Sequence, residues 1–352
     1  MNKIYFIALF SCILNINLSA RETIGMLVGT YTEGSESKGV YLYHFNQEDA
    51  SFSLLDTEES GNPSFVIVSA DRRFAYAVNE YNDGRQALSS FRLGEKSIDF
   101  INTKAIEGAD PCNLLLWEGN LISSDYSGGS FTWLSVLADG SIGEVLKRHA
   151  FSPNSEKHSH IHCAVPSPDG RYVFLTDLGL NCIHRIGGSE VSCVWKSKEN
   201  IGPRHIVFGK DGRFAYLLGE KGDRLVVFSY KDGELKEIQS VNAYSGKGKG
   251  SADIHFSPDG KFLYTSHRLV GDGISLFSVN RKTGLVSMKS FQPTGRHPRN
   301  FAITPNGRYL LCACRDSDAI EIYLRDEETG ELSDTGRRIE LPKPVCIQFY
   351  HD

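Results

Sequence analysis

Ionisable side chains recur at fixed distances from a series of short turns in this chain. The segment GPRHIVFGKDGRFAYLLGE, residues 202–220, begins with Arg204 and His205 and ends with Glu220, and its middle is apolar around a Lys-Asp-Gly turn. A buried strand pair gains nothing from charge at one end unless another charged group lies there. Arginine offers a permanently charged fork to carboxylate or phosphate, and histidine exchanges protons near neutral pH. The pattern therefore predicts a ligand-binding or catalytic cluster.

Other hairpins supply polar side chains at the same levels. Counted from the Asp or Asn of each turn, they lie seven residues before it (His162, Arg204, Arg299), six before it (His205, Asp253) and nine after it (Glu80, Glu220, Arg268). Antiparallel pairing places the start of one strand beside the end of the next, so these levels should meet at one end of the hairpins. We expect the catalytic residues to be His162, Glu220, Arg204 and Arg268. We expect the substrate-binding residues to be His160, His205, Asp253, Arg299 and Glu80.

Such a cluster suits the attack of water on the carbonyl carbon of a lactone. The carbonyl oxygen gains negative charge during attack, and arginine donors stabilise that charge. A histidine with its ordinary pKa of about 6.5 moves a proton at neutral pH. His160 and His162 point the same way on a strand, so the sequence leaves open which of them carries the proton. The structural alternative is that the charged residues only tie neighbouring hairpins together.

A repeat of apolar alternation, tight turn, basic residue, aromatic residue and second apolar alternation runs along the chain. The repeats begin at Pro63, Pro111, about Ile161, Pro203, Ser251, Pro298 and Pro344, in steps of 42 to 50 residues. Each repeat is a β-hairpin followed by further strand-like pieces. Four strands in a unit of this length are typical of one β-propeller blade.

The two ends of the chain each supply part of the seventh unit. KPVCIQFY near the C-terminus is a first strand with no second strand after it, and MLVGTYTEG from Met26 is a second strand with no first. The sequence therefore predicts an all-β, seven-bladed β-propeller with four antiparallel strands per blade. We expect residues 21–352 to form this single domain, with the N- and C-terminal strands closing the ring in one blade.

The first 20 residues have the pattern of an export signal. Lys3 precedes a short apolar run, Ile4 to Leu14, and the segment ends in a passable cleavage site at Ala20. We expect export to the periplasm or beyond the cell. Lipid attachment at Cys12 is an alternative, and a cytoplasmic protein follows if the segment is not a signal. No second apolar stretch is long enough for a transmembrane span.

Composition excludes several further classes. A net charge of -5 with a pI near 6.1 gives no reason to expect nucleic-acid binding. Removing Cys12 with the signal leaves seven cysteines, an odd number that argues against a complete disulfide framework and favours buried free thiols. No His/Cys cluster has zinc spacing, so we expect no metal and no cofactor. The glycine-rich segment YSGKGKGSAD is expected to be a loop bordering the ligand, and the protein a monomer or homodimer.

Whole segments of the chain resemble the seven-bladed lactonase family, which includes bacterial 6-phosphogluconolactonases and fungal carboxymuconate lactonising enzymes. The resemblance rests on GTYT, HIHCAVPSPDGRYVFLTDLG, GPRHIVFGKDGRFAYLLGE, ADIHFSPDGKFLYTSHR and HPRNFAITPNGRYLL, and covers essentially the mature chain. It implies a metal-independent site at one end of the channel. The family's histidine falls on His160 or His162, its arginine and glutamate on Arg204 and Glu220, and a further arginine on Arg268. SADIH departs from relatives in the residue before Ala252.

Three functions follow as hypotheses from the cluster and the resemblance. The first is a lactonase that opens a sugar-derived lactone, 6-phosphogluconolactonase-like, in carbohydrate metabolism. Because 6-phosphogluconolactone is an intracellular intermediate, an exported enzyme would act on another sugar or acidic lactone. The second is a carboxymuconate cyclase, which forms a lactone from an unsaturated dicarboxylic acid. The third is a propeller that binds a ligand or protein without turnover.

Overall fold

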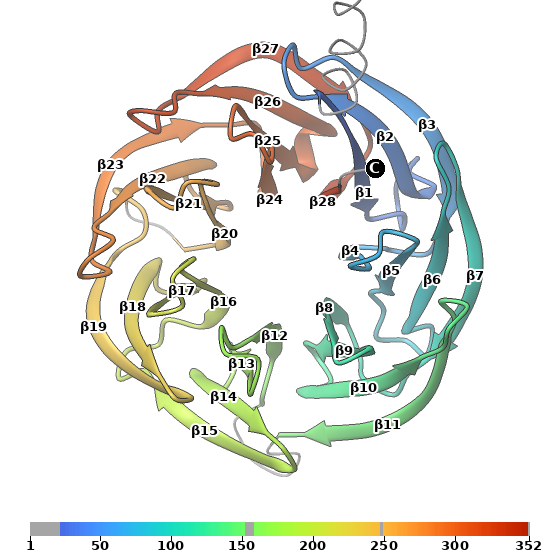
Figure 1. Ribbon diagram of the computed structural model, residues 1–352, viewed down its shortest axis with the longest axis horizontal. Helices are drawn as coiled ribbons and strands as arrows, with labels where there is room; N and C mark the ends of the chain where they lie inside the picture. The colour runs from blue at the N-terminus through green and yellow to red at the C-terminus, as the bar shows by residue number, and fades with distance from the viewer. Residues whose placement is uncertain (1–21, 152–157, 247–248, 351–352) are drawn as a thin grey trace, which may run out of the picture.

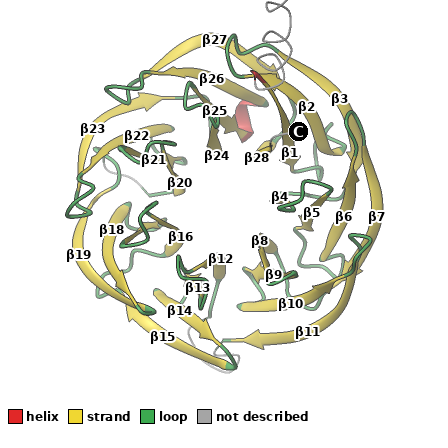
Figure 2. Cartoon of the chain, viewed as in Figure 1, coloured by secondary structure: helices red, strands yellow, loops and turns green. Residues whose placement is uncertain are grey.

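A ring of seven β-sheets makes up the computed structural model, which describes residues 22–151, 158–246 and 249–350 (Figure 1). Each sheet has four antiparallel strands, and the strands dominate the chain (Figure 2). A single turn of 3-10 helix, Arg315–Ser317, follows the strand β25 (Tyr309–Cys314). The all-β, seven-bladed propeller is confirmed. The export signal expected in residues 1–20, including Cys12, lies outside the described residues.

The blades follow one another around the ring, and within each blade the strands run from the channel outward. Their bounds are: blade 1, β28 (Pro344–Tyr350), β1 (Thr23–Thr30), β2 (Gly39–Asn46) and β3 (Phe52–Glu59); blade 2, β4 (Val66–Val68), β5 (Phe74–Asn79), β6 (Ala87–Leu93) and β7 (Ile98–Ala105); blade 3, β8 (Pro111–Trp117), β9 (Asn120–Asp125), β10 (Ser130–Val136) and β11 (Ile142–Ala150); blade 4, β12 (Ile161–Pro166), β13 (Val173–Asp177), β14 (Cys182–Gly187) and β15 (Glu190–Lys196); blade 5, β16 (Pro203–Phe208), β17 (Phe214–Gly219), β18 (Arg224–Lys231) and β19 (Glu234–Asn242); blade 6, β20 (Ser251–Phe256), β21 (Phe262–His267), β22 (Gly273–Val279) and β23 (Val286–Pro293); blade 7, β24 (Pro298–Ile303), β25 (Tyr309–Cys314), β26 (Ala319–Arg325) and β27 (Leu332–Glu340).

The repeat origins predicted from the sequence coincide with the first strands of six blades, which begin at Pro111, Ile161, Pro203, Ser251, Pro298 and Pro344. Blade 2 differs, because β4 begins at Val66 rather than Pro63. There the Ser64 amide bonds back to the Asn62 carbonyl at 2.7 Å, while the Asn62 and Phe65 carbonyls accept from the Glu80 and Val78 amides, so the pairing with β5 is irregular before Val66. The turn chemistry therefore located the blades to within a few residues.

A β-bulge interrupts the first strand of several blades next to the channel. The pairing register shifts between Pro203 and His205, so that Arg204 is the extra residue, and the same irregularity occurs at Cys112, His162 and Arg299. A bulge places two residues opposite one and re-aims a side chain away from the regular pleat. The sequence columns seven residues before the turns are these bulge positions.

The hydrophobic core lies between neighbouring blades rather than inside any one of them. Phe174 of blade 4 packs with Leu217 and Phe228 of blade 5, and all three are fully buried. Each such side chain stabilises the fold by about 1.5–3 kcal/mol relative to exposure. Blades 1 and 7 share a cluster of the same kind, containing Val28 and Ile320. The apolar contact between blades therefore continues through the junction of the chain ends.

Pairing of the two chain ends closes the ring as predicted. Strand β28 pairs antiparallel with β1, with Gly25 opposite Tyr350 and Val28 opposite Ile347. This pairing covers the edge that the second strand of an incomplete blade would expose. It also makes blade 1 depend on both ends of the described chain.

The cysteines of the described chain behave mostly as small apolar residues. All seven are free thiols, and every one except Cys193 is buried. Cys312 and Cys314 alternate with Ala313 within β25. Among the described residues, no helix has the length and apolar character needed to cross a bilayer.

The contact between blades 1 and 2 can be tested at Gly29 in β1. A Cβ atom at this position would overlap the Pro63 carbonyl oxygen, which belongs to backbone and cannot move aside alone. We expect Gly29→Ala to lower the free energy of unfolding by about 1–3 kcal/mol, as overpacked cores do. Chemical denaturation followed by tryptophan fluorescence measures the change.

Gly209→Ala is the matched control, because the nearest atom to its added Cβ is the Phe214 oxygen at 3.7 Å, an ordinary contact. Its effect should stay below about 1 kcal/mol. Equal effects of the two substitutions would show that the blade junction does not depend on the close approach at Gly29.

Candidate active site

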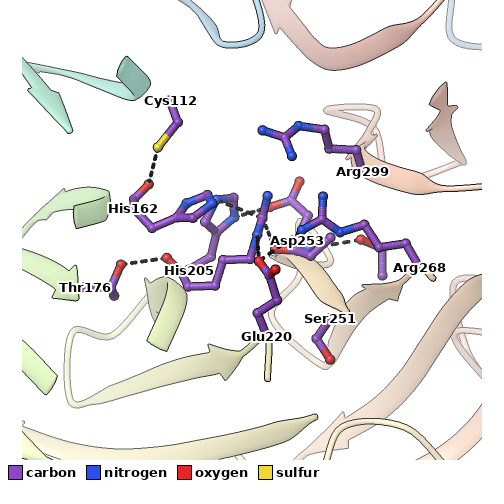
Figure 3. Close-up of polar contacts among 12 residues, drawn as sticks. Cys112, His162, Thr176, His205, Glu220, Ser251, Asp253, Arg268 and Arg299 are labelled. Atoms are coloured by element: carbon purple, nitrogen blue, oxygen red, sulfur yellow. Dashed lines mark hydrogen bonds and ion pairs between the residues drawn. The ribbon is translucent and has the colours of Figure 1, made fainter. Parts of the chain in front are cut away.

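A partly exposed carboxylate joins two arginines at one end of the channel. Glu220 follows β17, and its Oε2 accepts hydrogen bonds from Arg204 Nε at 2.9 Å and from Arg268 Nη2 at 3.0 Å. Arg204 comes from the bulge of β16, and Arg268 directly follows β21 in the next blade. Both arginine side chains are almost fully buried. The structure thus brings together three predicted site residues from two blades. Figure 3 shows Glu220 and Arg268 of this group, with His162, His205 and Arg299 around them.

The two guanidinium groups differ in the contacts they have left for a ligand. Arg204 Nη1 also donates to the Ala252 carbonyl oxygen and lies 3.2 Å from His205 Nε2. Arg268 Nη1 lies 3.3 Å from His297 Nε2, while its Nε is buried and makes no hydrogen bond within the described residues. Arg204 is therefore held by the protein, and Arg268 retains an unpaired donor.

A second ion pair lies across the channel on blades 7 and 2. Arg299, from the bulge of β24, approaches Glu80 with 3.6 Å between Nη2 and Oε2. Glu80 also accepts hydrogen bonds from the Tyr31 hydroxyl at 2.9 and 3.0 Å and from Ser64 Oγ. The Arg299 guanidinium lies over the Tyr31 ring, 5.4 Å from its centroid. The predicted binding residues Arg299 and Glu80 are therefore part of the same cluster of channel residues.

The two candidate histidines have different surroundings. His162 occupies the bulge of β12, is 5% exposed, and lies edge-on to His205 with 5.2 Å between ring centroids. Its Nδ1 is buried without a hydrogen-bond partner in the described chain. His160 stacks on Tyr126 at 4.5 Å, and its Nδ1 lies 2.9 Å from the Tyr126 carbonyl oxygen. His162 has a free ring nitrogen inside the cluster, whereas His160 is held against Tyr126.

Asp253 lies behind His205 rather than among the arginines. Its Oδ1 lies 2.8 Å from His205 Nδ1, and its Oδ2 lies 2.9 Å from His255 Nε2. Asn300 also donates to Oδ2. Asp253 is thus a positioning residue that fixes the ring of His205, which in turn contacts Arg204 and His162.

The charges of the cluster set the protonation of its members. Burial alone would raise the pKa of Glu220, but the positive charges of Arg204, Arg268 and Arg299 hold it below its ordinary value. Burial, together with repulsion from Arg204 and Arg299, lowers the pKa of Arg268 to about 9. Glu220 is therefore ionised at neutral pH, and Arg268 remains positively charged.

The expectation that His162 keeps an ordinary pKa is wrong. Burial, followed by repulsion from Arg204, places the pKa of His162 well below its usual value. Burial and Arg204 likewise lower the pKa of His205 to about 4, although Asp253 opposes the shift. Both rings are therefore neutral at pH 7, and His162 can accept a proton but does not carry one at rest.

Two tyrosines complete the cluster and were missed in the sequence. Tyr31 follows β1 and Tyr126 follows β9, the same place in their blades that Glu80, Glu220 and Arg268 hold in theirs. Counting from the turn Asp or Asn did not reach them, because the first strand of blade 1 lies at the C-terminus and blade 3 has a degenerate turn. Arg315 also follows a second strand, but its guanidinium pairs with Asp316.

The glycine-rich segment borders the cluster through its backbone. The Gly250 amide donates to the Glu220 carbonyl at 2.8 Å, and the Gly250 carbonyl accepts from the Arg268 amide at 3.1 Å. Gly250 has φ +120, and a Cβ there would overlap the Arg268 carbonyl oxygen. Residues 247–248 of this segment lie outside the described chain. Glycine is thus needed where the loop passes between two site residues.

Comparison with known proteins agrees with this arrangement. A family model described as "Lactonase, 7-bladed beta-propeller" matches residues 25–349. The chain belongs to this family. A 6-phosphogluconolactonase of Formosa agariphila is 33% identical over 92% of this chain and 99% of its own, and one of Bacillus subtilis is 28% identical over 92% and 97%.

Solved structures of this lactonase family superpose on the whole ring. A Bacteroides fragilis protein is 40% identical, with a TM-score of 0.90 over 94% of this chain and 99% of its own. A periplasmic gluconolactonase of Pseudomonas aeruginosa is 29% identical, with a TM-score of 0.87 over 93% of this chain and 99% of its own.

The protonation of the lactonase-family site can be tested by NMR of the protein with 15N-labelled histidine. Because burial and Arg204 disfavour the charged ring, His162 should stay neutral from pH 8 down to pH 5. The pKa of His255 should lie above its ordinary value. Burial lowers this pKa, but attraction of the charged ring to Asp253 raises it by more. Unfolded histidine binds a proton near pH 6.5 and folded His162 does not, so His162 makes the fold less stable as pH falls below about 6.5.

The His162 signal is assigned by its loss in His162→Gln. Titration of that ring near pH 6.5 in the folded protein would contradict the electrostatic account of the site.

Proposed function

We propose that this protein hydrolyses a lactone of a sugar acid at the end of the channel where the three arginines meet. The observation that carries the proposal is a pair of buried polar atoms left unpaired in the described chain, His162 Nδ1 and Arg268 Nε. Buried polar groups are normally satisfied, so an unpaired acceptor and an unpaired donor within one ionic cluster are places where a bound ligand or water would complete the hydrogen bonding. One is a proton acceptor and the other a cationic donor, which are the two groups that hydrolysis of an ester needs.

The geometry supports a direct attack of water. Neutral His162 accepts a proton from the water as its oxygen bonds to the lactone carbonyl carbon. Arg268 donates a hydrogen bond to the carbonyl oxygen as negative charge develops there. The bond to the ring oxygen then breaks, and that oxygen takes the proton from His162. The OH of water is thereby added to the carbonyl carbon, which becomes a carboxylic acid. Its remaining proton is added to the former ring oxygen, which becomes a hydroxyl group.

Glu220 and Glu80 support this step without reacting. Glu220 holds Arg204 and Arg268 at fixed positions, and Glu80 with Tyr31 holds Arg299. Donors that are already oriented need no rearrangement when charge appears in the transition state. Arg299 then remains to bind the anionic or hydroxyl groups of the sugar acid.

The relatives support the sugar-lactone class of substrate. Those of Formosa agariphila and Bacillus subtilis are named for 6-phosphogluconolactone, and that of Pseudomonas aeruginosa for gluconolactone in the periplasm. These names do not favour the cyclase or the binding-only alternative. For this chain we infer an unphosphorylated sugar lactone as the substrate, because its first 20 residues have the pattern of an export signal.

The proposed roles predict that three substitutions lower the activity on δ-gluconolactone. His162→Ala removes the proton acceptor, Arg204→Ala a charged donor, and Glu220→Gln the charge that holds two arginines. Each should lower kcat/KM at least about tenfold. A pH-indicator assay measures kcat/KM after the rate of spontaneous hydrolysis has been subtracted. The circular dichroism spectrum should stay that of the unaltered protein.

Arg213→Ala is the control, because Arg213 is an exposed arginine paired with Asp211 in a turn. It should retain the activity of the unaltered protein. Full activity of His162→Ala would remove the histidine from the mechanism, and consumption of a carboxymuconate in place of lactones would establish the cyclase.

The export proposal is tested by fractionating cells that express the full chain. The mature protein should appear in the periplasmic or extracellular fraction, shortened at its N-terminus, which intact-mass measurement detects. Cys12→Ser should not change this location, because the proposal does not use lipid attachment. A full-length protein in the cytoplasmic fraction would contradict the export signal and favour the phosphorylated lactone.

A further inference from the structure

Two thiols and one imidazole converge in the outer strands of blade 4, away from the channel cluster. They belong to Cys182 and His184 in β14 and to Cys193 in β15, and their ligand atoms all lie within 4.8 Å of one another. Cys182 Sγ lies 3.4 Å from His184 Nε2. Cys182 and His184 are buried, while Cys193 is exposed. The group therefore has a closed side and a side open to solvent.

Blade 3 provides an internal comparison for this group. There the second strand ends in Asp125, which accepts hydrogen bonds from Ser130 and Thr132 of the third strand. Blade 4 has Asp177 at the end of its second strand, and Cys182 and His184 stand where blade 3 has the two hydroxyls.

The outermost strands of the two blades differ at the corresponding position. In blade 4, Cys193 pairs with His184, and in blade 3, Arg148 pairs with Thr132. Hydroxyl groups thus satisfy the buried carboxylate of a blade. Two thiols and an imidazole around one point are not required by the fold.

The geometry fits a tetrahedral cation better than a disulfide. Zinc lies about 2.3 Å from a thiolate sulfur and about 2.05 Å from an imidazole nitrogen. In a tetrahedral site these distances separate the sulfur and the nitrogen by about 3.6 Å. Cys182 Sγ and His184 Nε2 lie 3.4 Å apart, which is close to that value. The pairing register sets Cys182 opposite Lys196 and Cys193 opposite His184. Diagonal residues of this kind lie about 7–8 Å apart, at or beyond the span that a disulfide bridges.

We propose that Cys182, His184 and Cys193 form a binding site for one thiophilic divalent cation, Zn²⁺, with its fourth position open to solvent beside Cys193. Thiolate and imidazole ligands are those that zinc prefers. On binding, each thiol releases its proton to solvent. Neutral His184 moves its proton from Nε2 to Nδ1 and offers the Nε2 lone pair to the cation.

Asp177 connects this site to the strand that carries His162. Its Oδ2 lies 3.1 Å from His184 Nε2 and accepts from Ser159 Oγ at 2.6 Å, and its Oδ1 accepts from the His160 amide at 3.0 Å. A cation at His184 would face this carboxylate in place of the imidazole proton. A bound cation would thus act on the entry to β12 through Asp177, at a distance from the channel cluster.

Metal binding is tested on the full chain after removal of metals with a chelator under reducing conditions. Co²⁺, used as a spectroscopic probe, should bind in a one-to-one ratio and give thiolate-to-cobalt charge-transfer absorption that Zn²⁺ abolishes. Zn²⁺ in about 100-fold excess over its dissociation constant should raise the thermal midpoint by roughly 4 °C.

Two variants and a control separate this site from other thiols. Cys193→Ser changes an exposed ligand, and Cys182→Ser combined with His184→Thr reproduces the side chains of blade 3, so both should fold and lose the cobalt absorption. Cys346→Ser, a buried thiol in β28, should keep it. Charge-transfer bands that persist in both variants, absence of these bands in the unaltered protein, or a Cys182–Cys193 disulfide in its unreduced mass spectrum would each overturn the proposal. None of these readouts depends on lactone hydrolysis.

Discussion

The bridge from Arg204 through Glu220 to Arg268 is the interaction on which the candidate site depends. Two guanidinium groups lie buried in the same space, and each would be costly without a partner of opposite charge. Glu220 compensates both with a single oxygen, at 2.9 and 3.0 Å. Because the three residues come from two blades, the bridge also fixes the positions of β16, β17 and β21 relative to one another. Removing the carboxylate from such an arrangement leaves buried charge uncompensated, at a cost of about 3–5 kcal/mol.

Positive charges lie close together in the wider cluster. The guanidiniums of Arg204, Arg268 and Arg299 face the carboxylates of Glu220 and Glu80, and the Asp253 carboxylate acts on Arg204 from behind His205. These charges are buried, where Coulomb interactions are stronger than in water. An anionic substrate, or the oxyanion that forms during attack on a carbonyl, would lie beside donors that already carry positive charge. Burial, reinforced by the same guanidiniums, lowers the pKa of His162 and keeps it unprotonated, so that its ring is available as a base.

The sequence predicted the ring because turn residues and alternation are local properties. Six predicted blade origins are the first residues of strands, and the columns counted from the turns found Arg204, Glu220 and Arg268 together. It did not predict the protonation of His162, which depends on burial among distant arginines, or the role of Tyr126, whose blade has no regular turn. It also missed the grouping of Cys182, His184 and Cys193, because strand pairing rather than spacing along the chain brings them together. The sequence pattern did not predict properties that depend on contacts between strands or blades.

Most blades separate stabilising and chemical roles by one residue. In five blades the second strand ends in a buried polar side chain that hydrogen-bonds within its own blade: Thr30, Asn79, Asp125, Asp177 and His267. In four of these five blades the next residue belongs to the channel cluster: Tyr31, Glu80, Tyr126 and Arg268. Because hydrogen bonds hold the buried side chain in place, the residue after it leaves the strand in a defined direction. That residue therefore loses little further conformational entropy when it binds a ligand. Blade 5 has Gly219 at the anchoring place, and there the ion pair with Arg204 orients Glu220 instead. The propeller can therefore change its channel residues while the hydrogen bonds that hold each blade stay as they are.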